Sequence, residues 1–91
     1  MILTFKHKGL AELFERERTR RNRHELQSRC LRRLDVLDQA EALSDLNVPG
    51  FNFHSLHGAP KRYSIHVNSP WRITFKWKDG NALRVDLEQY H

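Results

Sequence analysis

The chain has 91 residues, of which 38% are hydrophobic and 30% are charged. This supplies enough apolar material for one core but excludes a large cofactor-binding architecture, so we expect one domain over residues 1–91 and no cofactor. Sixteen Lys and Arg against eleven Asp and Glu give a net charge of +5, which favours polyanionic partners, nucleic acid first.

Two features bear on the cellular compartment. The start, MILTFKHKG, lacks the apolar region and cleavage site of a secretory signal, and the single cysteine, Cys30, cannot form an internal disulfide. No apolar run approaches the length of a membrane span, and the basic stretch has no long apolar opposite face. We therefore expect a cytoplasmic protein with no membrane partner.

The first half of the chain predicts one strand and two helices. Residues 1–6 alternate like a short strand that ends at Gly9. Residues 10–17 carry apolar side chains at i, i+3 and i+4, which predicts a short amphipathic helix. Residues 22–43 predict a longer helix, whose apolar stripe consists of Leu26, Cys30, Leu34, Leu37 and Ala40. Pro49 and Gly50 then end the helical half.

After Gly50 the hydrophobic period changes to two, which predicts strands over 51–56, 63–67, 71–77 and 82–88. Asp79-Gly80 is typical of a tight hairpin between the last two strands. The side chains expected to face the core from these two strands are Trp71, Ile73, Phe75, Trp77, Leu83, Val85 and Leu87. The predicted fold is α+β: an N-terminal strand, two helices, and an antiparallel β-meander packed on the helices.

The same alternation places polar side chains on the opposite face of the sheet, namely His54, His66, Arg72, Arg84, Asp86, Glu88 and, if the last strand continues, Tyr90. Cleavage of RNA needs a base for the 2′-hydroxyl, a cation for the phosphate and an acid for the leaving 5′-oxygen. Histidine and arginine can supply these groups without a metal. Water also solvates the open face of many antiparallel sheets, so alternation alone leaves both interpretations open.

Three further patterns also have two interpretations. His54 and His57 could form a metal pair, but no cysteine accompanies them and we expect no metal site. The arginine-rich stretch from 16 to 33 fits either a solvated helix face or a contact with RNA phosphates. Trp71 and Trp77 share their side of the strand with apolar residues and are expected in the core, as is Cys30.

The segments FKHKGLAELF, FHSLHG, SIHVNSPWRITFKW and the final QYH resemble the HigB toxins of the RelE/ParE superfamily, over nearly the whole chain. Members of that family are small bacterial toxins that enter the ribosomal A site and cut mRNA there until a HigA antitoxin silences them. The resemblance therefore implies a RelE-like fold and endoribonuclease activity. It also implies a HigA-type antitoxin, the ribosome with its mRNA, and operator DNA reached through the antitoxin complex as partners.

Carried over position by position, the catalytic residues that the family implies are His54, Arg72, Tyr90 and His91. The residues expected to contact RNA through their charge are Lys6, Lys8, His57, Arg20, Arg21 and Arg23. Many relatives have an aspartate where this chain has Gln89, and relatives often have a lysine in place of His57. Glutamine cannot take a proton, which keeps a rival function open. The rival is a non-catalytic module of the same fold that occludes a target or acts as a co-repressor with its antitoxin on operator DNA.

Overall fold

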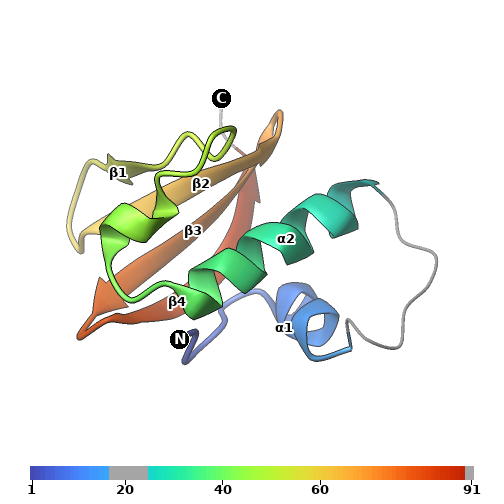
Figure 1. Ribbon diagram of the computed structural model, residues 1–91, viewed down its shortest axis with the longest axis horizontal. Coiled ribbons are helices and arrows are strands. Elements are labelled where there is room, and N and C mark those ends of the chain that lie inside the picture. The colour runs from blue at the N-terminus through green and yellow to red at the C-terminus, as the bar shows by residue number, and fades with distance from the viewer. Residues whose placement is uncertain (17–24, 90–91) are drawn as a thin grey trace.

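A computed structural model describes residues 1–16 and 25–89 of the chain (Figure 1). Its elements are the helices α1 (Lys8–Glu15) and α2 (Glu25–Gln39), the 3-10 turn η2 (Leu43–Leu46), and the strands β1 (His54–Leu56), β2 (Arg62–Asn68), β3 (Trp71–Lys78) and β4 (Asn81–Gln89). The strands form one antiparallel sheet in the order β1-β2-β3-β4, and α2 lies across one face of it with α1 beside α2 (Figure 1). This confirms the predicted α+β class and the meander.

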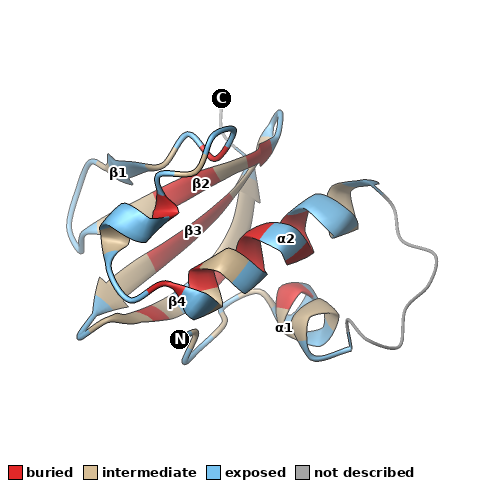
Figure 2. Cartoon of the chain, viewed as in Figure 1, coloured by how far each residue is buried: buried red, intermediate tan, exposed pale blue. Residues whose placement is uncertain are grey.

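The core lies between α2 and the sheet, and buried residues follow the middle of the strands and the side of α2 that faces them (Figure 2). Leu34 and Leu37 of α2 are fully buried, as are Ile73 and Phe75 of β3. Trp71 and Trp77 pack against this cluster from its rim, as predicted. Cys30 is also in the core, where burial raises the pKa of its thiol to about 11 although the charge of Arg33 lowers it. The cysteine therefore stays protonated and acts as an apolar side chain.

Local hydrogen bonds move the helix ends from their predicted positions. Helix α1 starts at Lys8 rather than at residue 10 because the Leu10 N–H donates to Nδ1 of His7 at 3.1 Å, so Gly9 lies inside the helix. Helix α2 ends at Gln39 rather than at residue 43. The Asp45 carboxylate accepts the N–H groups of residues 41 and 42, which lowers its pKa and diverts two donors that a continuing helix would use.

The predicted start of this second helix, residues 22–24, lies outside the described residues. Within residues 1–16 and 25–89, the structure contains no helix with the length and apolar character of a membrane span.

The N-terminal segment differs from the continuous strand expected over residues 1–6. It makes two isolated parallel bridges to β4, Ile2 with Ala82 and Phe5 with Val85. Between these bridges β4 carries a β-bulge, at which Arg84 adopts a left-handed conformation with φ 51°. The Arg84 N–H donates to Oγ1 of Thr4 at 2.7 Å instead of to a regular ladder partner. The bulge therefore interrupts the ladder that a continuous strand would need.

The bulge also reverses which side chains of early β4 face the core. Thr74 pairs with Asp86 but Lys76 pairs with Leu83, so two β4 residues lie opposite the one β3 residue between them. Leu83 consequently shares the polar face with Lys76, and the fully buried residue before it is Ala82. The prediction that Leu83 points into the core is wrong, because one extra residue in a strand moves its neighbours to the other face.

Candidate active site

Strand pairing gathers the predicted polar residues on the sheet face opposite α2. Directly paired residues point to the same face of a sheet. One row across the sheet consists of His54, Ser64, Thr74 and Asp86, and the next consists of His66, Arg72 and Glu88. The polar face deduced from alternation is thus confirmed as one continuous surface that spans all four strands.

A pocket of about 200 Å³ opens on this surface, and it is lined by Asn52, His54, Ser64, His66 and Arg72. Two of the predicted catalytic residues, His54 and Arg72, therefore share one hollow. His66, which was expected on the polar face but only as a surface residue, is half-buried and lines the same hollow. We call this hollow the imidazole pocket.

Two hydrogen bonds fix the ring of His54. Its Nδ1 lies 2.9 Å from the backbone oxygen of Asn52, and its Nε2 lies 3.2 Å from Oγ of Ser64. A carbonyl oxygen can only accept a hydrogen bond, so Nδ1 of the neutral ring carries the proton and donates it. Nε2 is then left with a lone pair, which the Ser64 hydroxyl can contact. The ring is therefore oriented to act as a base through Nε2.

The turn that holds this carbonyl also explains why β1 is short. Asn52 has a φ of 45°, a left-handed conformation that asparagine tolerates better than most residues. This turn ends the extended conformation expected from residue 51, so β1 begins only at His54, and Phe51 packs in the core with 3% of its surface exposed. The single asparagine before the strand is the sequence signal that could have located this support.

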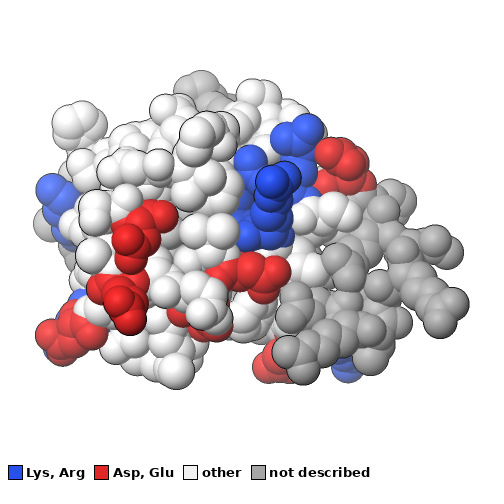
Figure 3. All heavy atoms as spheres, in the orientation of Figure 1, with Lys and Arg blue, Asp and Glu red and all other residues white. Residues whose placement is uncertain are grey.

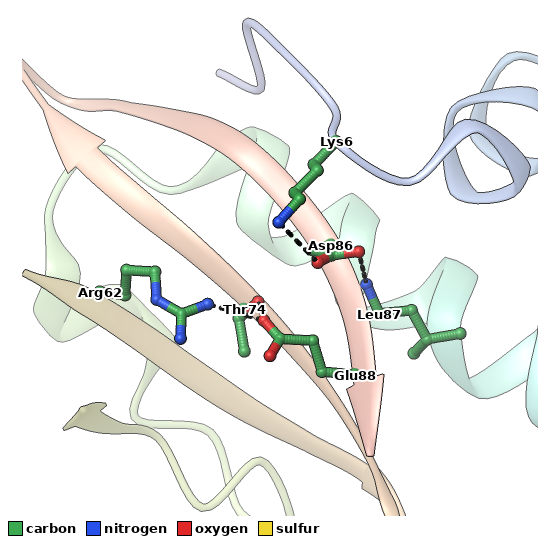
Figure 4. A network of polar contacts seen from close by, with 6 residues as sticks. All are labelled: Lys6, Arg62, Thr74, Asp86, Leu87 and Glu88. Atoms are coloured by element: carbon green, nitrogen blue, oxygen red, sulfur yellow. Dashed lines mark hydrogen bonds and ion pairs between the residues drawn. The ribbon is translucent and has the colours of Figure 1, made fainter. Parts of the chain in front are cut away.

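Next to the imidazole pocket, Glu88 of β4 is held by two donors, one from β3 and one from β2 (Figure 4). The hydroxyl of Thr74 and Nη1 of Arg62 both donate to Oε2 of Glu88, the latter at 2.7 Å. Partial burial acts to raise the pKa of Glu88, whereas the two hydrogen bonds and the charges of Arg62 and Arg72 act to lower it. The lowering effects are larger together, so the pKa lies below its ordinary value of 4.5. Glu88 is thus a carboxylate at neutral pH, paired in register with Arg72.

A second hollow, of about 420 Å³, adjoins this network and is lined by Lys6, Pro60, Arg62, Lys76, Arg84, Asp86 and Glu88. We call it the basic trough. Nζ of Lys6 lies 4.0 Å from Asp86, which brings one of the predicted RNA-contacting residues to this hollow (Figure 4). None of its other cationic residues was among the predicted site residues.

The arginine-rich stretch divides into exposed and buried members. Arg33 is only 7% exposed: its Nε donates to the His66 carbonyl at 2.7 Å and its guanidinium lies 4.8 Å from the Phe51 ring centroid. Burial, together with the charges of Arg29 and Arg32, lowers its pKa. Arg33 therefore supports β2 from behind the imidazole pocket, and it fits neither of the two interpretations of this stretch, the solvated helix face or the contact with RNA.

On the face that shows α2, Lys and Arg gather over the N-terminal half of that helix, and acidic side chains gather beyond its C-terminal end (Figure 3). The exposed arginines of α2 are Arg29, which pairs with Glu25 at 2.9 Å, and Arg32. This leaves basic side chains exposed on the helix face, so the two interpretations of the stretch remain open for these residues.

The remaining predicted site residues fall into two groups. Lys8 and His57 are exposed and line neither the imidazole pocket nor the basic trough. The others, Arg20, Arg21, Arg23, Tyr90 and His91, lie outside the described residues. In the part of the chain that the structure describes, no three His, Cys, Asp or Glu side chains gather as metal ligands would. The absence of a metal from the reaction stays a prediction.

Comparison of the sequence with known proteins shows the family to which the chain belongs. Residues 3–91 match the family described as the RelE-like toxin of type II toxin-antitoxin system HigB. The chain is 39% identical over 92 residues to "Endoribonuclease HigB" of Proteus vulgaris, with 100% of both chains covered. It is 38% identical over 97 residues to "Toxin HigB-1" of Vibrio cholerae, covering 99% of this chain and 98% of that protein. The protein therefore belongs to the HigB family of RelE-like toxins of type II toxin-antitoxin systems.

Proposed function

We propose that the protein is an endoribonuclease that cuts mRNA in the ribosomal A site, by attack of a 2′-hydroxyl and without a metal. The observation that carries this proposal is the imidazole pocket, which both His54 and Arg72 line on one face of the sheet. A relative with 39% identity over the full length carries the name endoribonuclease, which supports the same activity.

The hydrogen bonds of His54 suit the first proton transfer. With Nδ1 donating to the Asn52 carbonyl, Nε2 can accept the proton of the 2′-hydroxyl as its oxygen attacks the adjacent phosphorus. The guanidinium of Arg72 offers donors to the phosphate oxygens on which charge builds in the transition state. The products are a 2′,3′-cyclic phosphate and a 5′-hydroxyl, so neither an oxidant nor a cofactor enters the reaction.

The second proton goes to the leaving 5′-oxygen, and we assign it to the end of the chain. His91 shares proton transfer with His54, and Tyr90 positions a base or the sugar. Within the described residues, strand β4 is paired with β3 as far as Gln89, which lies opposite Trp71. Gln89 itself cannot act as an acid or a base.

The partners follow from the family and from charge. Lys6, together with the exposed Lys8 and His57 and the residues Arg20, Arg21 and Arg23, would contact RNA phosphates of the ribosome or its message. A HigA-type antitoxin would neutralise the protein in the cytoplasm, and the complex of the two would bind operator DNA.

The test is expression in a bacterium followed by mapping of mRNA 5′ ends. Breaks within translated codons are expected from the native protein. His54→Ala and Arg72→Ala are each expected to lower the breakage rate by roughly 10²–10⁴-fold, the usual contribution of a positioned acid-base or charge-stabilising group. Lys78→Ala is the control, because Lys78 is exposed and lines neither hollow. Growth arrest with intact messages would contradict the nuclease and favour the occluding module.

A further inference from the structure

We propose that the basic trough is a second phosphate subsite, which binds an RNA backbone phosphate near the one that is cut. This inference rests on the proposed function and adds three residues to it, Arg62, Lys76 and Arg84. None of them was expected to contact RNA from the sequence. They come from three strands and are brought together only by the pairing of the sheet.

The charges of the trough favour an anion. Four cationic and two acidic side chains line it, which leaves two positive charges in excess. The acids are already occupied: Glu88 accepts from Arg62 at 2.7 Å, and Asp86 lies 4.0 Å from Lys6. Within residues 1–16 and 25–89, the side chains of Lys76 and Arg84 form no ion pair or hydrogen bond. Their charges are therefore available to a ligand.

One of these two cations lies at an irregular point of the backbone. Arg84 occupies the β-bulge of β4 with a φ of 51°, a conformation that costs a residue other than glycine about 1–2 kcal/mol. A regular ladder continued from the pair of Thr74 with Asp86 would place Arg84 opposite Lys76, whereas the bulge shifts this pairing by one residue to Leu83. Arg84 nevertheless lines the trough together with Lys76, so the shifted register keeps both cations at the same hollow.

The position of the trough points to RNA as the source of the phosphate. The trough and the imidazole pocket open on the same face, and Glu88 lines the trough while its register partner Arg72 lines the pocket. Arg72 and Lys76 are four residues apart on β3, which corresponds to roughly 13 Å along a strand. A single RNA strand that places one phosphate on Arg72 can therefore reach the trough with another, a few nucleotides away.

The test compares the native protein with the double variant Lys76→Gln/Arg84→Gln on ribosomes programmed with a short message. The variant is expected to lose roughly tenfold or more in kcat/KM with kcat nearly unchanged, because the subsite binds RNA without touching the reacting atoms. The plot of log affinity against log salt should flatten by about 0.7, since each phosphate contact to a single strand contributes about 0.7. Lys61→Gln/Lys78→Gln removes two exposed charges that lie outside the trough, and it should change kcat/KM far less.

A second arm identifies which RNA supplies the phosphate. If it is the message, neutral methylphosphonate linkages placed one at a time near the cut should slow the native protein at one position and leave the double variant unaffected there. If it is ribosomal RNA, no linkage has this effect, and the double variant binds vacant ribosomes more weakly. Either result supports the subsite.

Two results would overturn the proposal. The first is a double variant with native kcat/KM and native salt dependence. The second is a double variant that binds RNA normally but binds the antitoxin more weakly, which would make the trough a protein-binding surface. Failure of the proposed function would give a different result from failure of the subsite, because the native protein itself would then leave the message intact.

Discussion

Arg62 on β2 donates a hydrogen bond to Glu88 on β4 at 2.7 Å, across the strand that separates them (Figure 4). The hydroxyl of Thr74, on the intervening β3, donates to the same oxygen of Glu88. One carboxylate thus joins three strands on the face that carries both hollows. Because Thr74 is 1% exposed, its hydroxyl depends on this acceptor.

The first prediction concerns the stability that this carboxylate provides. Glu88→Ala leaves the buried Thr74 hydroxyl without its acceptor and should lower the free energy of unfolding by about 2 kcal/mol. Glu88→Gln keeps an acceptor oxygen and should cost about 1 kcal/mol, since the ion pair with Arg62 is partly exposed and contributes little. Urea unfolding of both variants, with Thr74→Val to complete a double-mutant cycle, measures the coupling. Additive effects of the two positions would show that they do not interact.

The second prediction is a pH dependence that the same contacts cause. The pKa of Glu88 is lowered in the folded protein, so between that pKa and the ordinary value of 4.5 the unfolded chain binds the proton more readily. The stabilisation is therefore fully present above about pH 5.5 and is lost as the pH falls through the folded-state pKa. The stability difference between the native protein and Glu88→Gln, followed by urea unfolding from pH 7 to 3, should shrink accordingly. A constant difference would contradict this origin.

The third prediction tests the β-bulge. Leu83 lies on the polar face, so Leu83→Thr should change the free energy of unfolding by no more than about 0.5 kcal/mol. Val85 is fully buried, and Val85→Thr should cost about 1–3 kcal/mol because it places a hydroxyl in the core. Thermal or urea unfolding of the two variants makes the comparison directly. Equal losses would mean that β4 alternates without a bulge.

The fourth prediction concerns the buried cation behind the imidazole pocket. Arg33→Lys keeps the charge but loses the planar guanidinium that contacts both the His66 carbonyl and the Phe51 ring. We expect a loss of about 1–3 kcal/mol in the free energy of unfolding, since a partly buried carbonyl is left without its donor. Arg32→Lys, one residue away and exposed, is the matched control. If the two variants unfold alike, Arg33 has no structural role.

The fifth prediction concerns the turn that orients His54. Asn52→Gly permits the φ of 45° and keeps the carbonyl that accepts from Nδ1, so the rate of RNA cutting should stay near the native rate. Asn52→Val is strained in this conformation and should lower stability by about 1–2 kcal/mol and the cutting rate with it. Cutting of a programmed message and urea unfolding, measured side by side, separate the two effects. A valine variant with native cutting would show that the turn does not position the ring.

Much of the site was accessible from the sequence because strand alternation is a local property. The period of two after Gly50 predicted β2, β3 and most of β4, and it placed His54 and Arg72 on one face. The Asp79-Gly80 turn was equally readable, and both residues do have positive φ, at 53° and 78°. These features depend on side-chain polarity and on turn chemistry, which each segment carries by itself.

What the tertiary structure alone decided is the register between strands and the places where it slips. The bulge at Arg84 turned Leu83 to the polar face, although apolar and polar residues alternate along β4 without a break in the sequence. The bond from Arg62 to Glu88 joins residues 26 positions apart, on strands that are not neighbours. Alternation assigns a face within one strand, but which residues meet across strands depends on pairing and packing of the whole sheet, and no single segment contains that information.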